Sequence, residues 1–380
     1  MMKVYVTSFF EASITSRLNV TENDFSLTDK PTDKVVINVY HQNLCGISNK
    51  KLDLELYLDS LPVVQHFVCV TEHFLNKVTV PLLVLPEYYL ATYNVRTNKK
   101  RGGSLILSRN DKKTEELSMC NKLYLAEAFE VCGIRDVETN INVICCYRSP
   151  RESNFEIFME KLELMLNHFF NKNCLICGDF NINLHLRDSR STALLTLLKC
   201  YNFRPLVITS TFLRNNSESC IDNVFTNLTE SSILSIDVDH NGLADGHAGL
   251  LCRIETDSMY SSKLQSQPLI RRERRCFNDI NNNKFRLKLL NQNWYDLGIN
   301  NFIKKFMYTF KSSFKKTLKA SKVNRKCKWI SKGLKTSSKM KRFLTIIDKE
   351  HLDSSMATYR GKYLKLYRQL IRNAKKNAVQ

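Results

Sequence analysis

The sequence predicts an α+β protein with mixed β-sheets and helices outside them, two or more layers deep. In residues 35–255, strand-like runs are joined both by polar turns, as in hairpins, and by amphipathic helices, as in strand–helix–strand units. From residue 256 the chain becomes polar, basic and helical in pattern. We therefore expect an N-terminal extension at 1–34, one folded domain at 35–255 and a basic helical region at 256–380.

The first elements alternate between strand and helix. Val35–Tyr40 is rich in β-branched residues, which is typical of a strand, and it is followed by His41-Gln-Asn43. The leucines of Lys51–Ser60 alternate with period two, but its composition and its place between two strands favour a helix. His66–Val70 predicts a second strand, and a glycine turn leads into a third at Ser104–Ser108.

A hairpin and a long helix follow. Ala126–Ile134 and Ile141–Tyr147 are apolar runs joined by a polar turn. Apolar residues at helical spacing predict a helix over Ser153–Phe170, with Ser153 and Glu156 as a capping box. The remaining elements of this domain are a strand at Cys174–Cys177, a helix at Ser191–Cys200, and strands at Ile221–Thr226 and Ala248–Ile254.

The basic region is expected to hold three or four helices. Phenylalanine recurs at every fourth residue over Phe302–Phe314, which is typical of a packing face, and amphipathic stretches follow at Leu334–Ile347 and Met356–Ala374. Residues 261–380 carry 31 Lys and Arg against 6 Asp and Glu, and the whole chain has a net charge of +20. That asymmetry indicates a polyanionic partner for this region, either nucleic acid or anionic lipid.

The cysteines and the hydropathy pattern bear on the compartment. The chain has 13 cysteines, an odd number, and several lie inside strand-like runs, where cysteine acts as a small hydrophobic residue. Cys174 and Cys177 have no second pair at zinc-site spacing, so no zinc site is expected. The sequence has no signal-peptide pattern and no apolar run of about 20 residues, so we expect an intracellular protein without a membrane span.

Polar residues stand at the ends of apolar runs that lie far apart in the chain. Gly178-Asp179-Phe180-Asn181 follows such a run and sets a carboxylate and a carboxamide two residues apart, on one side of an extended backbone. A carboxylate can accept a proton from water, and an amide can orient that water or a phosphate oxygen. The other strand-end residues are Asn43, Glu72, Tyr147, Asp222 and the cluster of Asp245 and His247.

Seven segments, taken together, resemble one family. They are His41-Gln-Asn43, Thr71-Glu-His73, Arg101-Gly-Gly103, Tyr147-Arg-Ser-Pro150, Gly178-Asp-Phe-Asn181, Cys220-Ile-Asp-Asn223 and Gly242-Leu-Ala-Asp-Gly-His247. The chain resembles the endonuclease/exonuclease/phosphatase superfamily, especially the apurinic-type endonuclease domains of jockey-like non-LTR retrotransposons. The resemblance implies a four-layered αββα sandwich of two mixed sheets, with a site at one end that hydrolyses a phosphodiester in DNA.

The resemblance also implies a metal site and its ligands. By the family pattern, Glu72 is the main ligand of a Mg²⁺ ion, with Mn²⁺ as an alternative. Asn43 and Asp245 complete the site, and oxygen ligands of this kind suit a hard cation. Cys45 stands where many relatives have an acidic or amide residue near the metal.

Catalytic roles follow from the same resemblance. Asp179 is expected to orient or deprotonate the attacking water. Asn181 and Tyr147 are expected to contact the phosphate. Asp222 is expected to pair with a histidine that meets the phosphate and stabilises its developing charge.

One departure from the family pattern concerns that histidine. Family members end the site with adjacent Asp and His, whereas Gly246 here separates Asp245 from His247. A shift of one residue turns a side chain to the opposite face of an extended backbone, although a glycine bulge can restore its direction. We expect His247 to reach the site; the alternatives are His240 and a site that has lost its histidine.

The basic region resembles the segment between nuclease and reverse transcriptase in such elements. Its expected nucleic-acid contacts are Arg271, Arg272, Arg274, Arg275 and Lys328. The resemblance implies DNA as the partner, element RNA as a second one, and action in the nucleus. The leading hypothesis is an endonuclease that nicks one DNA strand and leaves a 3′-hydroxyl. The alternatives are a catalytically decayed nucleic-acid-binding relic and a phosphomonoesterase of the same superfamily.

Overall fold

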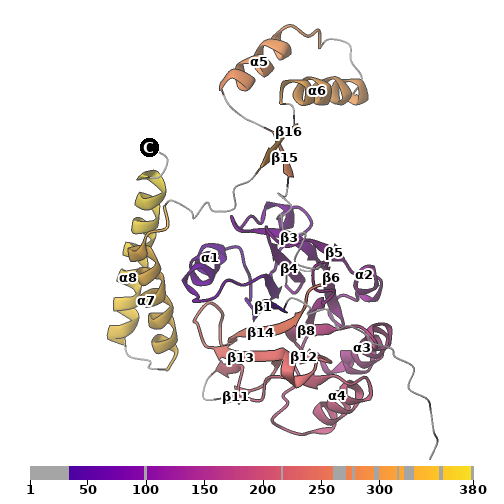
Figure 1. Ribbon diagram of the computed structural model, residues 1–380. Coiled ribbons are helices and arrows are strands. Elements are labelled where there is room, and N and C mark those ends of the chain that lie inside the picture. Colours follow the sequence, from indigo (N-terminus) through magenta and orange to yellow (C-terminus); the bar gives the residue numbers. More distant parts are fainter. Residues whose placement is uncertain are drawn as a thin grey trace, which may run out of the picture. The chain divides into compact units, whose positions relative to one another are not determined.

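The computed structural model describes residues 34–97, 101–214, 217–259, 271–275, 279–294, 299–314, 316–320, 329–350 and 354–377. Two six-stranded sheets, seen in Figure 1, have the orders β13-β14-β1-β2-β4-β3 and β5-β6-β7-β8-β12-β9. Both sheets are mixed, because β1 pairs with β2, and β7 with β8, in parallel, whereas the neighbouring pairs are antiparallel.

The strands are short and end where the sequence turns polar. The first sheet contains β1 (Lys34–Asn43), β2 (Phe67–Thr71), β3 (Tyr88–Tyr93), β4 (Ser104–Arg109), β13 (Ile233–Asp239) and β14 (Gly249–Asp257). The second contains β5 (Thr114–Glu116), β6 (Glu130–Asp136), β7 (Asn142–Tyr147), β8 (Cys174–Asp179), β9 (Arg204–Pro205) and β12 (Asp222–Thr226).

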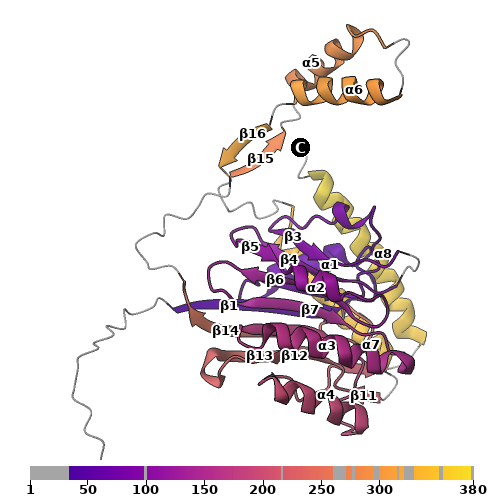
Figure 2. The same cartoon turned by 90° about the vertical axis from the view of Figure 1, so that its right-hand side faces the viewer.

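Helices cover the outer face of each sheet, which confirms the predicted αββα sandwich (Figure 2). On the first sheet, α1 (Lys51–Ser60) buries Leu54 and Leu58. On the second sheet, α3 (Phe155–Phe169) buries Phe158 and Leu162, and α2 (Ser118–Leu123) and α4 (Ser189–Cys200) pack beside it. The ambiguous leucine run at residues 51–60 is therefore helical, and Leu54 and Leu58, four residues apart, share the face that packs on the sheet.

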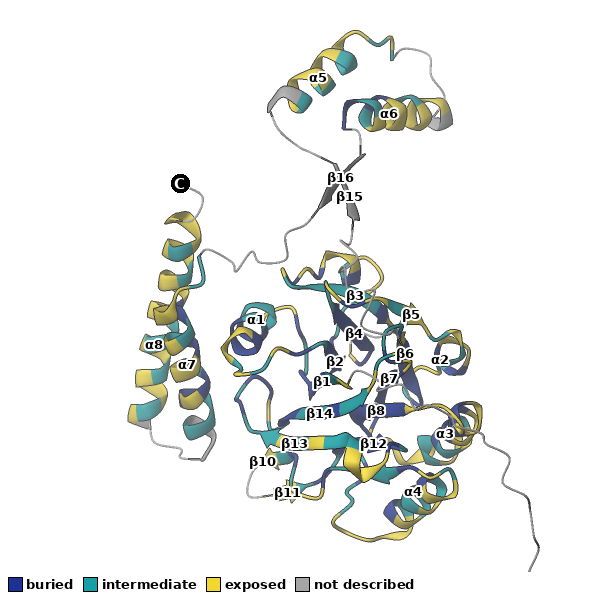
Figure 3. Cartoon of the chain, viewed as in Figure 1, coloured by how far each residue is buried: buried dark blue, intermediate teal, exposed yellow. Residues whose placement is uncertain are grey.

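A third apolar core lies between the two sheets. It contains Val39 and Ile106 from the first sheet and Val143 and Leu175 from the second. Free thiols fill the same layer, at Cys69, Cys132, Cys145, Cys177 and Cys252. The expectation that these cysteines act as small hydrophobic residues is confirmed, and Figure 3 shows buried residues concentrated in the strands of both sheets.

Two expectations about boundaries and caps were wrong. The residues expected to open a strand at Ala126 form a turn instead, and β6 begins only at Glu130. The long helix begins at Phe155 after a short 3-10 helix, η2 (Glu152–Asn154), so Ser153 lies before the helix and makes no capping box. Asn154 donates Nδ2 to the carbonyl of Glu127 at 3.2 Å, which ties this turn to the neighbouring loop.

The described part of the basic region is mostly helical, as expected. It contains α5 (Asp279–Leu290), α6 (Ile299–Ser313), α7 (Lys332–Glu350) and α8 (Ser354–Asn377), with the unexpected pair β15 (Arg271–Arg275) and β16 (Lys316–Ala320). Phe285 of α5 meets the rings of Phe306, Phe310 and Phe314 at centroid distances of 5.2–5.9 Å. The phenylalanine stripe is therefore a packing face. Within the described ranges, every helix is too short or too polar to cross a membrane.

Candidate active site

Polar side chains from both sheets meet at one end of the sandwich. Asn43 ends β1, Glu72 follows β2, Tyr147 ends β7 and Asp179 ends β8. Because β1 with β2, and β7 with β8, form parallel pairs, the carboxyl ends of each pair lie at the same edge of their sheet. The Asn43 amide links the sheets, since its Nδ2 donates to Glu72 Oε1 at 3.0 Å and to Asp179 Oδ2 at 2.8 Å.

Asp222 and His247 join this group from the other direction. Strand β12 runs antiparallel to β8 and sets Asp222 opposite Asp179. His247, in the loop before β14, places Nδ1 at 2.9 Å from Asp222 Oδ2. One polar atom from each of Asp179, Asp222 and His247 lies within 4.8 Å of the others, and all three side chains are buried.

The glycine before His247 gives the imidazole its direction. Gly246 has φ of +84°, and its carbonyl accepts a hydrogen bond from the Leu213 amide at 3.0 Å. A Cβ at Gly246 would lie 2.7 Å from Phe212 Cε2, so a side chain has no room there. Phe212 belongs to β10 (Phe212–Arg214), and its ring packs 4.7 Å from that of His247. His247 therefore points toward Asp222, the first of the orientations considered from the sequence.

Burial and mutual repulsion set the charges of the site. Burial raises the pKa of Asp179 to about 8, and the nearby charges of Asp222 and Glu72 contribute. Burial by itself lowers the pKa of His247, but the charge and hydrogen bond of Asp222 outweigh it and raise that pKa to about 9. Burial, with Glu72 and Asp179, also raises the pKa of Tyr147 far above its usual value. At neutral pH, His247 is therefore a cation beside Asp222, and Tyr147 is a hydrogen-bond donor.

Arg148 holds the turn that carries Asp179 and Asn181. Its guanidinium is buried and donates to the carbonyls of Phe180 and Asn181 at 3.3 and 3.2 Å. In return, Asn181 Nδ2 donates to the Arg148 carbonyl at 2.7 Å. Asn181 has φ of +50°, a strained value that these bonds stabilise. Sequence analysis gave Arg148 no role, although it belongs to the Tyr147–Pro150 segment.

A buried ion pair between Arg96 and Glu130, which was not expected from the sequence, lies beside Tyr147. Arg96 Nε donates to Glu130 Oε1 at 2.5 Å, and the Arg96 guanidinium lies 5.9 Å from the centre of the Tyr147 ring. The Gly103 amide also donates to Glu130. The side chain of Glu130 is fully buried, so the Arg96–Glu130 pair lies beneath Tyr147 and supports its ring. The consecutive glycines Gly102 and Gly103 were the feature of the sequence that could have indicated this contact, because the Gly103 amide bonds Glu130.

The donor set suits a hard divalent cation. Glu72 presents a half-buried carboxylate, and Asp222 Oδ1 is buried without a hydrogen-bond partner among the described residues. Asn43 turns its amide nitrogen to the carboxylates, while its Oδ1 accepts from the Cys45 amide at 3.0 Å. Asp245 is exposed and lies outside the three-residue cluster, yet its charge contributes, after burial, to raising the pKa of Cys45 to about 12.

The expected nucleic-acid contacts are four arginines of β15 and Lys328. Strand β15 contains Arg271, Arg272, Arg274 and Arg275, and the structure describes only the backbone of this strand. Lys328 lies outside the described residues.

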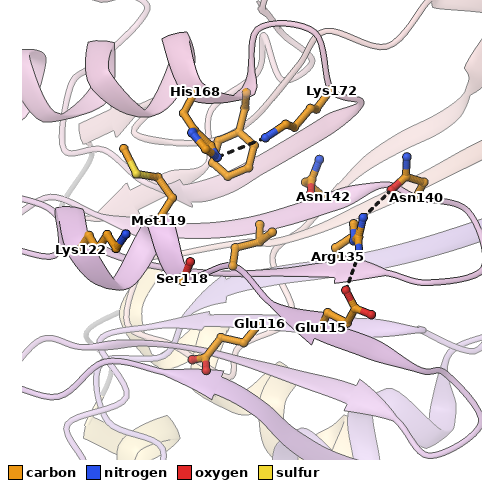
Figure 4. A pocket seen from close by; sticks show the side chains of 12 residues that line it. Glu115, Glu116, Ser118, Met119, Lys122, Arg135, Asn140, Asn142, His168 and Lys172 are labelled. Atoms are coloured by element: carbon orange, nitrogen blue, oxygen red, sulfur yellow. Dashed lines mark hydrogen bonds and ion pairs between the residues drawn. The ribbon is translucent and has the colours of Figure 1, made fainter.

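A pocket of about 380 Å³ lies at the opposite end of the second sheet (Figure 4). It is lined by Asn142, where β7 begins, whereas Tyr147 ends β7 at the candidate site. Its charged side chains pair locally, with Arg135 bound to Glu115 and Lys172 at 3.1 Å from His168 Nε2. The pocket is therefore separate from the polar cluster at the strand ends.

Several solved structures are similar to this chain. The endonuclease domain of TRAS1, a telomere-specific non-LTR retrotransposon, has 17% identity and a TM-score of 0.46 over 58% of this chain and 98% of its own. The catalytic domain of Xenopus laevis APE2 has 15% identity and a TM-score of 0.47 over 60% and 94%. The 3′-5′ exonuclease NExo from Neisseria meningitidis has 12% identity and a TM-score of 0.46 over 57% and 99%.

A search of the curated proteins found no match. The sequence profile of the endonuclease/exonuclease/phosphatase family matches residues 37–245, which is more than half of the chain. This range covers the second sheet, and it covers the first sheet apart from β14 and the first residues of β1. The chain belongs to the endonuclease/exonuclease/phosphatase family.

Proposed function

We propose that residues 35–255 form a divalent-metal-dependent endonuclease that nicks one strand of DNA and leaves a 3′-hydroxyl. Members of the family are generally metal-dependent hydrolases of phosphodiester bonds. The observation that carries the proposal is the double hydrogen bond of Asn43, which joins Glu72 and Asp179 across the two sheets beside Asp222 and His247. This arrangement supports the roles proposed for Glu72 as a metal ligand, Asp179 as a base and His247 as a cationic donor, because their side chains lie together at the strand ends.

The cation would be held by Glu72, with Asn43 and Asp245 completing its protein ligands. Mg²⁺ is the first candidate, because carboxylate and amide oxygens are its usual protein ligands, and Mn²⁺ is the alternative. A bound cation would offset the charge of the phosphodiester and of the leaving oxygen. In the structure Asn43 directs Nδ2, not Oδ1, at Glu72 and Asp179. To contribute a ligand it would exchange the two ends of its amide, and the bound cation would then take the place of the two Nδ2 hydrogen bonds between the carboxylates.

The remaining residues act on water and phosphate. Asp179 serves as the general base in its ionised form. Burial raises its pKa to about 8, and a cation bound beside it would favour the ionised form that accepts the proton from water. His247, charged and held by Asp222 at 2.9 Å, stabilises the negative charge that develops on the phosphate. Tyr147 donates its phenolic hydrogen to a phosphate oxygen. Asn181 has a second amide hydrogen for the same purpose.

DNA is the proposed partner, and element RNA is a second one. The basic region supports this choice, because residues 261–380 carry 31 Lys and Arg and only 6 Asp and Glu. Arg271, Arg272, Arg274, Arg275 and Lys328 stay proposed contacts. We place the protein in a non-LTR retrotransposon lineage that acts in the nucleus, as the sequence segments suggest.

A supercoiled-plasmid nicking assay with Mg²⁺ tests the proposal. We expect open-circular product whose ends a DNA polymerase extends without prior treatment, since a free 3′-hydroxyl is the substrate for extension. EDTA and Asp179→Ala should each abolish nicking, whereas Glu160→Gln, an exposed carboxylate on α3, should leave it unchanged. DNA binding without nicking at any metal concentration would instead indicate a catalytically decayed relic. Phosphate release from a phosphomonoester, with DNA intact, would indicate a phosphatase.

A further inference from the structure

The hairpin of α7 and α8 is fixed to α1 by a buried carboxylate. Asp53 of α1 is only 6% exposed, and both of its partners come from the hairpin. Lys341 Nζ pairs with its Oδ2, and the Tyr367 hydroxyl donates to its Oδ1 at 3.1 Å. A buried carboxylate is costly unless it is paired and hydrogen-bonded, so α1 carries a face that requires the hairpin.

Arg342 continues this contact toward the candidate site. It is 7% exposed, and its guanidinium lies 5.2 Å from the centre of the Tyr57 ring. Its Nη1 donates to Ser338 Oγ at 2.8 Å within α7. The charges of Asp53 and Asp239 act on the same guanidinium, so the buried cation faces carboxylates on two elements of the nuclease body.

Tyr57 connects Arg342 to the loop that carries His247. Its hydroxyl donates to Asp239 Oδ2 at 2.5 Å, and Asp239 is the last residue of β13. The loop at 240–248 begins there and ends at β14. Within it, Gly242 has φ of +71°, and a Cβ at that position would lie 2.6 Å from the Arg342 carbonyl oxygen. The loop therefore packs directly on the backbone of α7.

The opposite side of this loop is bound to the interior of the sandwich. Gln42, next to Asn43, donates Nε2 to Asn241 Oδ1 at 3.0 Å and to the His247 carbonyl at 2.9 Å. Asn241 Oδ1 also accepts the Leu243 amide at 3.0 Å. The loop is thus held between Gln42 on one side and α7 on the other, and His247 lies at its end.

We propose that Arg342 is a positioning residue for the loop at 240–248, so that the α7–α8 hairpin belongs to the catalytic unit. The Arg342 guanidinium acts through Tyr57, which bonds Asp239 at the start of the loop, and the α7 backbone at Arg342 packs on Gly242. These contacts hold the loop in the register that aims His247 at Asp222. The role in catalysis rests on the proposed nuclease function, whereas the hold on the loop does not. The hairpin would then influence strand cleavage as well as nucleic-acid affinity.

Two variants of the full chain test the hold on the loop by amide hydrogen exchange at 240–248. Arg342→Ala removes the guanidinium, and Tyr57→Phe removes only the hydroxyl that bonds Asp239. We expect exchange in the loop to rise about 10-fold in Arg342→Ala and less in Tyr57→Phe, because local opening becomes easier. Lys335→Ala is the matched control. Lys335 of α7 also pairs with a carboxylate of α1, Asp59, at 2.6 Å, but both of these side chains are partly exposed.

The same variants test the effect on catalysis. At saturating duplex DNA and Mg²⁺, we expect the single-turnover nicking rate of Arg342→Ala to fall about 10- to 100-fold with an unchanged Kd, because small misplacements of a catalytic group are costly. Arg342→Lys should restore part of the rate, since it keeps the charge near Asp53 and Asp239.

Each outcome decides between the two claims. Unchanged exchange in the loop overturns the positioning role, and so does an equal rise of exchange in Lys335→Ala. If Arg342→Ala does not fold, the loop exchange of Tyr57→Phe decides whether the contact holds the loop. A rate loss explained wholly by a weaker Kd also overturns it. If the wild-type chain itself fails to nick DNA, the proposed function fails, while the exchange result still decides whether Arg342 holds the loop.

Discussion

The nuclease body and the basic helical region handle charge in opposite ways. In the body, carboxylates from distant segments are gathered into one buried cluster, where Asp179 and Asp222 lie together. Along α8 of the basic region, charge stays on the surface: the helix has no acidic residue, and Lys365, Arg368 and Arg372 are exposed. Arg342 of α7 is the buried exception described above. The first arrangement concentrates charge at one point, as the proposed chemistry requires, and the second spreads positive charge along a helix, as the proposed contact with a polyanion requires.

The two regions also differ in how their structure is encoded. The helices of the basic region follow from apolar spacing within each helix, and Phe285 packs on the stripe of a neighbouring helix. The site of the body requires strands that are far apart in sequence to end at one place. Local pattern therefore encodes the helices of the basic region, whereas topology encodes the polar cluster of the body.

The largest expected effect separates the two histidines considered from the sequence. His247→Ala should lower the nicking rate about 10²- to 10³-fold, the usual cost of losing a donor that stabilises transition-state charge. His240→Ala, in the same loop, is the control and should leave the rate unchanged. The measurement is single-turnover nicking at saturating DNA. A larger loss in His240→Ala would reverse the assignment.

Charge reversal on α8 tests whether the basic region is the polyanion-binding surface. The triple variant Lys365→Glu, Arg368→Glu and Arg372→Glu should bind duplex DNA at least about 10-fold more weakly and reduce the salt slope of log Kd by roughly 0.9 for each lost phosphate contact. Fluorescence anisotropy over a salt series measures both quantities.

The matched control for α8 reverses three exposed cations of the body, Lys77, Lys113 and Lys122. An equal loss of affinity in this variant would mean that total charge, and not the α8 surface, governs binding. The comparison between the two regions would then fail.

The pH dependence of stability should reveal the buried cluster. The folded pKa of Asp179 is raised to about 8, above the unfolded value of about 3.9, so the folded state binds more protons between these values. Stability in EDTA should therefore fall as pH rises from 4 to 8, and Asp179→Asn should flatten the profile. Thermal unfolding across this range measures it, with Glu160→Gln as control. An unchanged slope in Asp179→Asn would assign the dependence to other groups.

The smallest expected effect is confined to α5 and α6. Phe285→Ala removes the ring that meets Phe306, Phe310 and Phe314. We expect faster amide exchange in these two helices and no change in β7 and β8, since stability is not uniform across a structure. Faster exchange throughout both sheets would show that the phenylalanine cluster supports the nuclease body as well.

Much of the fold could be predicted from local pattern. The helix at Lys51–Ser60 was expected from its composition and its place between two strands, and the hairpin partner at residues 141–147 from an apolar run after a polar turn. The edge strand Ile233–Asp239 was not predicted, because its half-buried alternation is weak. The capping box at Ser153 failed because a 3-10 helix occupies those residues, whereas Asp188 caps α4 by accepting the Ser191 amide at 2.8 Å.

The sequence by itself determined which residue types stand at the strand ends and where the positive charge lies, because both are properties of short segments. Tertiary structure alone decided that Asn43 joins two carboxylates, that Gly246 turns His247 toward Asp222, and that Arg342 lies against Tyr57. These contacts join residues more than 20 positions apart, and some join residues nearly 300 apart. No periodicity within a segment encodes such distances; they follow from strand order, register and helix docking.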